Sequence, residues 1–176
     1  MKKFVLIVIL VLVLGGGAWW LRRSPSQPAK IVSNDPKNIS YEIEGQPIPL
    51  KAGSFETEAA PGSVEIVTTE YFGNDITGDF NNDGTKDVAF ILTQSGGGTG
   101  VFYYLVVALK TADGYVGTNG LAFGDRVAPQ STEWRNDEII LNYADRKPDE
   151  TFSVDPSVGV SKYFQVQGRQ LVEIKK

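Results

Sequence analysis

The stretch Gly78-Asp79-Phe80-Asn81-Asn82-Asp83-Gly84-Thr85-Lys86-Asp87-Val88-Ala89-Phe90-Ile91-Leu92 joins an acidic loop directly to an apolar run. With Asp79 counted as position one, side-chain oxygens fall at positions one, three, five and nine, on Asp79, Asn81, Asp83 and Asp87. Gly84 stands at position six and permits a sharp turn, because glycine adopts positive φ at little cost. Ca²⁺ prefers roughly six to eight oxygen ligands in a flexible cage. The spacing therefore predicts a calcium site made by these four side chains and the backbone carbonyl of Thr85.

This loop departs from the EF-hand pattern, in which a bidentate Glu occupies position twelve. Position twelve here is Phe90, inside the apolar run from Val88 to Leu92, which predicts a buried strand. A loop of the form D-x-N-x-D-G-x-x-D followed at once by a strand resembles the calcium loops of integrin-type FG-GAP repeats. The alternative is an Asx-rich turn that binds no ion, since Asn, Asp and Gly are the common turn residues.

Composition excludes several classes of function. The chain has 176 residues, no Cys and no His, so Cys nucleophiles, Cys/His zinc sites, His general bases and disulfides are all ruled out. The net charge is −4, and four of the 17 basic residues flank the first apolar run. From Ser24 onward, 13 basic residues stand against 21 acidic ones, a net of −8. Such a surface does not suit nucleic acid, and it suits divalent cations.

Residues 1–21 predict a single transmembrane anchor. Lys2 and Lys3 precede an uncharged run from Phe4 to Leu21, which as a helix spans ~27 Å, enough for the hydrocarbon core. Trp19 and Trp20 stand where an aromatic belt lies, and the basic N-terminus favours the cytoplasmic side. The alternative is a cleaved signal peptide, which makes the protein secreted. We expect an uncleaved anchor, and a linker at residues 22–39 that contains three prolines.

Residues 40–176 predict one extracytoplasmic β domain. Short apolar stretches alternate with turn residues at intervals of roughly ten residues, which is typical of an antiparallel sandwich or barrel. The strongest expected strands are 87–93 and 101–110, and the second is apolar on both faces and therefore central. The glycine-rich segment 94–100 between them lacks the features of a phosphate-binding loop and predicts a hairpin connection. Further strands are expected near residues 41–43, 48–50, 64–68, 115–123, 126–128, 138–143, 158–166 and 171–174, and a short helix fits only 124–136 or 145–157.

Several longer segments resemble a family of uncharacterised exported bacterial proteins. The resemblance rests on the segments 71–74, 78–90, 96–104, 124–130 and 142–146, and it covers roughly residues 40–175. In that family the module stands alone behind a membrane anchor or precedes a META-type β domain. The resemblance implies an exported location and carries no activity with it.

Two function classes remain open. The first is a non-enzymatic module, tethered to the membrane, whose calcium loop rigidifies it and whose protein or glycan partner is unknown. The second is a cell-envelope hydrolase that uses carboxylates, since carboxylate pairs cleave glycosides without His. Because the clustered carboxylates stand at metal-ligand spacing, we expect no enzyme. The pairs Asp125-Arg126 and Asp145-Arg146 predict surface ion pairs, with an anion-fixing pocket as the alternative.

Overall fold

The computed structural model describes residues 32–176, which fold mainly as β-strands. In this part of the chain the helical structure is one short 3₁₀ turn, η1 (Pro36–Asn38). No helix within the described residues is long and apolar enough to cross a membrane. The predicted anchor, residues 1–21, and the first part of the predicted linker lie outside the described residues. The end of that linker belongs to the domain, because Ser33 forms a bridge with Tyr115 and Ile39 is fully buried.

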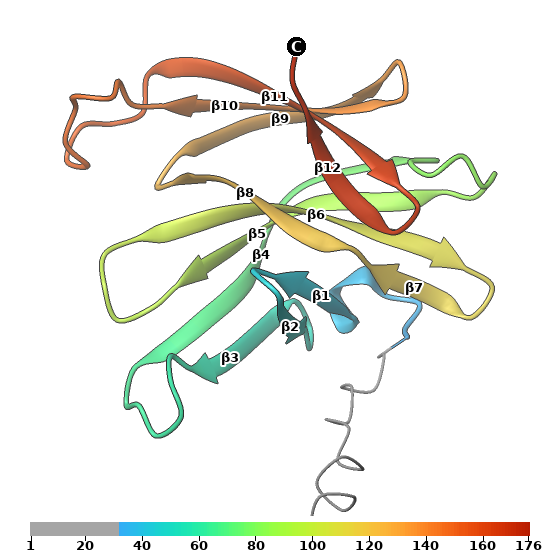
Figure 1. Cartoon of the computed structure of the whole chain (residues 1–176), viewed down its shortest axis with the longest axis horizontal. Helices are drawn as coiled ribbons and strands as arrows, with labels where there is room; N and C mark the ends of the chain where they lie inside the picture. The colour runs from blue at the N-terminus through green and yellow to red at the C-terminus, as the bar shows by residue number, and fades with distance from the viewer. Residues whose placement is uncertain (1–31) are drawn as a thin grey trace, which may run out of the picture.

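The strands fall into two sheets (Figure 1). The larger sheet has the order β2-β1-β8-β6-β5-β4-β3, and β7 adds to β6; the smaller sheet has the order β12-β11-β10-β9. Pairing is antiparallel throughout except between β1 and β8, which are parallel. The bounds are β1 (Ser40–Ile43), β2 (Gln46–Pro49), β3 (Ser54–Glu58), β4 (Ile66–Gly78), β5 (Asp87–Ser95), β6 (Val101–Thr111), β7 (Gly114–Gly117), β8 (Asn119–Asp125), β9 (Ala128–Arg135), β10 (Glu138–Asp145), β11 (Val158–Gln167) and β12 (Gln170–Ile174).

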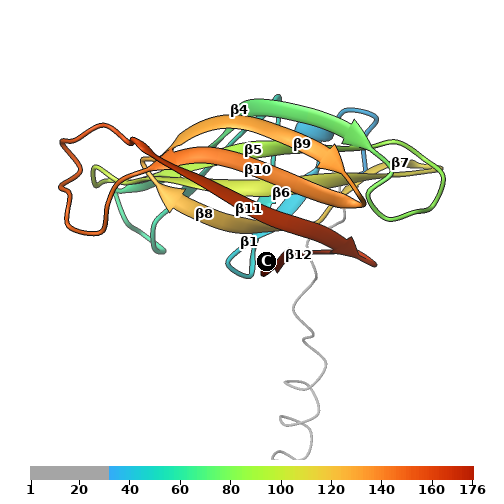
Figure 2. The ribbon, with the colours of Figure 1, turned by 90° about the horizontal axis from the view of Figure 1, so that it is seen from above.

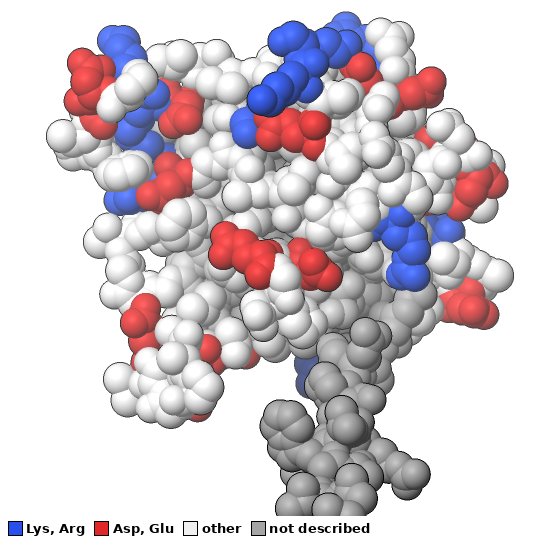
Figure 3. Space-filling model, viewed as in Figure 1, with Lys and Arg blue, Asp and Glu red and all other residues white. Residues whose placement is uncertain are grey.

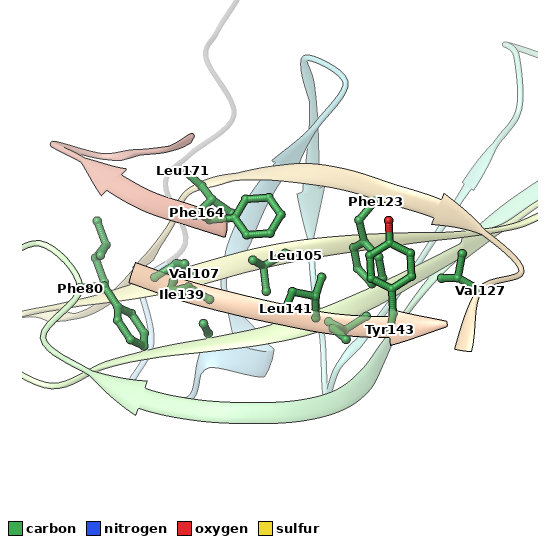
Figure 4. Packing of buried hydrophobic residues seen from close by; sticks show 13 residues of the cluster. Phe80, Leu105, Val107, Phe123, Val127, Ile139, Leu141, Tyr143, Phe164 and Leu171 are labelled. Carbon is green, nitrogen blue, oxygen red and sulfur yellow. The ribbon is translucent and has the colours of Figure 1, made fainter. Parts of the chain in front are cut away.

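One hydrophobic core lies between the two sheets. Figure 2 shows β9, β10 and β11 lying over the long strands of the larger sheet and running in broadly the same direction, as in an aligned sandwich. Figure 4 shows Ile139, Leu141 and Tyr143 of β10 facing Leu105 and Val107 of β6, with Phe164 of β11 beside them. Each fully buried side chain of this size contributes ~1.5–3 kcal/mol relative to exposure. This core joins the small sheet to the large one.

A second core lies on the opposite face of the larger sheet. There the alternate residues of β5 and β6, such as Phe90 and Val106, pack against Tyr41 and Ile43 of β1 and Ile48 of β2. The strands at the two ends of the sheet, β2 and β3, meet at a tight turn through the bridge Lys51–Ser54. The large sheet therefore curls into a nearly closed barrel around this second core, while its outer face forms half of the sandwich.

The predicted mainly β fold is confirmed, and so are the two strongest strands. Both faces of β6 are buried, as expected for a central strand, and the segment 94–100 connects β5 and β6 as an antiparallel hairpin. The expected strand 115–123 is two strands, β7 and β8, and residues 128–135 form β9 where a short helix was allowed. The segment 145–157 holds no helix either.

Candidate metal-binding loop

The acidic loop, residues 79–86, connects β4 to β5 at a point where Gly78 pairs with Asp87. A loop of eight residues whose two ends meet at one strand pair must turn sharply. The backbone makes these turns at Asn82 (φ 59°) and Gly84 (φ 84°). Glycine at position six is therefore explained by the conformation that the loop needs. The prediction that Gly84 turns the loop is confirmed.

Hydrogen bonds curl the loop around Asp79. Its two carboxylate oxygens accept the backbone N–H groups of Asp83 (3.0 Å) and Gly84 (2.9 Å). Asn81 Oδ1 also accepts the N–H of Asp83, at 3.1 Å. The side chains at positions one, three and five thus face the same short segment of backbone. The structure brings Asp79, Asn81 and Asp83 together.

Asp83 is held by polar neighbours within the loop. Its Oδ2 accepts the Asn81 amide at 2.9 Å, and its Oδ1 accepts both the backbone N–H and the hydroxyl of Thr85. The hydrogen bonds from Thr85, followed by the one from Asn81, hold the pKa of the Asp83 carboxyl below its usual value. Asp83 is therefore an exposed, ionised carboxylate at neutral pH, and Thr85 lies beside it.

Asp87 points the other way, into the protein. It is fully buried, and its oxygens accept the N–H groups of Phe80 (3.0 Å) and of Lys110 at the end of β6 (2.8 Å). Burial raises the pKa of Asp87, and these two amide hydrogen bonds oppose that rise. Asp87 therefore ties the start of the loop to a neighbouring strand, a structural role that ligand spacing alone does not predict.

Phe80 anchors the loop to the core between the sheets. Its ring is buried and packs edge-on against Trp134 of β9, with ring centroids 4.8 Å apart. A Cβ at Gly78 would lie 2.6 Å from the Phe80 ring, so this position admits only glycine without rearrangement. Trp134 was missed by the sequence analysis, because no local pattern marked β9. Asp75, further upstream on β4, accepts the Tyr71 hydroxyl at 2.7 Å and does not join the loop.

The three carboxylates of the loop do not converge on one point. Within residues 32–176, no group of three or more His, Cys, Asp and Glu side chains is arranged so that it could hold a metal ion. Asp79, Asn81 and Asp83 lie together and Asp87 lies behind them, turned inward. An ion in this loop therefore requires side chains to rotate from the arrangement described here.

The two Asp-Arg pairs lie at the same end of the sandwich, and their arginines bind other groups of the protein. Arg126 forms an ion pair with Asp125 (2.7 Å), which lowers the pKa of that carboxyl. Arg146 instead donates to the backbone oxygens of Arg126 (2.7 Å) and Val154. Phe152 lies against both guanidinium groups, 3.6 Å and 5.5 Å from its ring centroid. The expected ion pair is present at Asp125, whereas Arg146 fastens the loop after β10.

Comparison of the chain with protein-family models, with characterised proteins and with solved structures finds no match.

Proposed function

We propose that this chain is a non-enzymatic β module, tethered to the membrane outside the cytoplasm, whose acidic loop binds one structural Ca²⁺. The observation that supports the calcium site best is the curl of the loop around Asp79, with Asn81 and Asp83 beside it and Gly84 at positive φ. No observation among residues 32–176 gives the hydrolase alternative comparable support.

The ion would be held by oxygens from the loop. A carboxylate has about four lone-pair sites, so Asp79, whose oxygens each accept one N–H, keeps acceptor capacity toward an ion. Asn81 and Asp83 would exchange their mutual hydrogen bond for contacts to Ca²⁺, and the Thr85 carbonyl would add a backbone ligand. Asp87, which completes the predicted ligand set, contributes if one of its oxygens turns from Phe80 or Lys110.

Bound calcium would stabilise the module. Two carboxylates crowded near a protein surface repel by ~1–4 kcal/mol per close pair, and a dication replaces that repulsion with attraction. Extracellular calcium modules bind at ~10⁻⁴ to 10⁻³ M. At a hundred times the dissociation constant the bound ion adds ~2.7 kcal/mol to the free energy of unfolding.

We expect calorimetric titration to show one calcium site that Asp83→Ala abolishes. Asp83 is exposed, and its side chain hydrogen-bonds Asn81 and Thr85 of the same loop, so its removal should leave the fold intact. Lys86→Ala, a change at a neighbouring exposed position, should bind Ca²⁺ at least as well as the wild type. Mg²⁺ should bind poorly, because it demands a smaller, near-octahedral shell. Equal titration curves for the wild type and Asp83→Ala would place any bound ion elsewhere.

The tether is tested separately on the mature protein. We expect mass spectrometry of the mature protein, collected from both membranes and medium, to show an N-terminus before Phe4, because residues 4–21 are uncharged and long enough to span the hydrocarbon core. A mature N-terminus between residues 15 and 25 would mean that a signal peptide is removed and that the domain is secreted. This result would leave the calcium proposal untouched.

A further inference from the structure

The two end strands of the large sheet separate after a single paired position. Lys51 and Ser54 exchange both backbone hydrogen bonds, at 2.9 Å and 3.1 Å, across a two-residue turn. Beyond this pair, β2 and β3 are opposite ends of the sheet and are not paired with each other. The barrel therefore stays open along one seam.

A groove of about 1040 Å³ lies along this seam. Its walls are Gln46–Pro49 of β2 on one side and, on the other, Phe55 and the residues from Thr57 to Pro61, from β3 and the turn that follows it. Ile43, Val67 and Gln94 also line it, so the second hydrophobic core is accessible at its base. The groove is lined mainly by apolar atoms and bordered by two strand edges.

Backbone N–H and C=O groups alternate in direction along a strand, and this alternation determines which hydrogen-bonding groups the edges of β2 and β3 present to the groove. Since Lys51 and Ser54 hydrogen-bond across the seam, the residues two and four positions away also direct their backbone groups toward it. On β3 these are Glu56 and Glu58, each with an N–H and a C=O. On β2 they are Pro49 and Pro47, which lack an N–H. The prolines thus prevent β2 from pairing with β3, and β3 remains a pairing edge, with Glu58 lining the groove and Glu56 lining the smaller hollow at the turn.

The charge around the groove is strongly negative. Residues 40–72 contain six glutamates and one basic residue, Lys51, which lines a separate, smaller hollow at the turn rather than the groove. Glu44 and Glu58 line the groove itself. Figure 3 shows acidic side chains over β1 and around the lower-left lobe formed by β3 and the turn after it. A ligand with positive charge is therefore favoured over a neutral or acidic one.

We propose that this groove receives an extended, Lys- or Arg-containing segment of another protein, which adds to β3 as a strand. Strand addition uses backbone hydrogen bonds for affinity, and side-chain pockets and charge for specificity. A second copy of this chain fits less well, because joining two β3 edges would bring Glu56 and Glu58 of each copy together. The proposal concerns a different part of the molecule from the calcium loop and does not depend on it.

Fluorescence anisotropy with the full chain in neutral detergent tests the proposal. The probe is a labelled peptide of alternating Lys and Val, and its controls are the Glu-Val peptide and a Lys-Val peptide methylated at alternate backbone nitrogens. We expect the Lys-Val peptide to bind, and each control to bind at least about tenfold more weakly. The Glu-Val peptide lacks the positive charge, and the methylated peptide lacks backbone N–H donors for pairing with β3. No binding of the Lys-Val peptide up to about 1 mM, or equal binding of all three, would overturn the proposal.

Variants locate the site. Glu44→Lys with Glu58→Lys should weaken Lys-Val binding about tenfold or more, whereas two equal charge changes on the distant exposed loop, Asp149→Lys with Asp155→Lys, should leave it within about twofold. Pro47→Val with Pro49→Val restores donors to β2, so this variant should close the seam and lose binding while melting no lower than the wild type. The assignment would be contradicted if both groove variants bound the Lys-Val peptide as well as the wild type does. Self-association of the wild type that the peptide does not displace would also contradict it.

Discussion

Asp87→Ala is expected to lower the free energy of unfolding by about 3 kcal/mol or more, and the melting temperature by about 6–12 °C. Asp87 is fully buried, and its two oxygens accept the N–H groups of Phe80 and Lys110. Alanine leaves both donors without a partner, and a buried unsatisfied donor costs ~1–3 kcal/mol. Asp87→Asn keeps one acceptor and should show about half of the loss. Urea denaturation of residues 32–176 measures the free energy of unfolding of both variants.

The loss of stability in Asp87→Ala should be observed in chelator as well as in Ca²⁺. Asp83→Ala is the matched control, because it removes an exposed carboxylate of the same loop and should lower stability much less than Asp87→Ala does in chelator. The two variants separate the aspartate that fastens the loop from one that would only bind an ion. Equal stability of Asp87→Ala and the wild type in chelator would contradict the structural role of Asp87.

Phe90→Ala is expected to cost about 3–5 kcal/mol of unfolding free energy. The Phe90 ring is 1% exposed and lies edge-on between Tyr41 of β1 and Tyr71 of β4, at centroid distances of 5.6 Å and 5.4 Å. Its removal leaves a cavity in the second core and two aromatic contacts unmade. Since the whole domain is expected to have only ~5–15 kcal/mol of stability, denaturant midpoints should fall sharply.

Phe72→Ala provides the comparison, because Phe72 is 45% exposed although it also contacts an aromatic ring, that of Tyr103. We expect it to cost less than about 1 kcal/mol. Similar losses for the two variants would mean that β1 does not cover this face of β5 and that the large sheet is not curled as described.

The sequence predicted the parts of the fold that local pattern specifies. Val101 to Lys110 is apolar at nearly every position, and only a central strand buries both faces in this way. Gly84 at position six indicated a turn that the backbone confirms. Neither inference needs knowledge of distant contacts, and both are correct.

Long-range contacts account for the errors. The expected strand 115–123 is divided at Thr118 into β7 and β8, and β8 starts at Asn119, whose side chain bonds the backbone of Leu171, while Gly120 pairs with Ile43 of β1. A Cβ at Gly120 would lie 3.1 Å from Ile43, so the glycine permits close packing of strands. Local propensity cannot reveal partners that are about 50 residues away or more.

The polar edge strands were missed for a related reason. Residues 128–135 of β9 and 54–58 of β3 are rich in Ser, Thr and Glu, and most of their side chains are exposed. They form strands because the backbone groups of a neighbouring strand are available for pairing. Their own sequence pattern does not predict a strand. The inward turn of Asp87 was likewise hidden, since ligand spacing does not distinguish an aspartate facing the loop from one that binds the end of β6.

Thermal melting of residues 32–176, stripped with chelator and then measured with and without millimolar Ca²⁺, tests the calcium site most directly. We predict a higher melting temperature in Ca²⁺, corresponding to ~0.4–1.4 kcal/mol at one to ten times the dissociation constant and to ~2.7 kcal/mol at a hundred times. The increase should be absent in Asp83→Ala and present in Lys86→Ala. Identical melting of the wild type with and without Ca²⁺ would show that the loop is only an Asx-rich turn, held together by the hydrogen bonds of Asp79, Asn81 and Asp83.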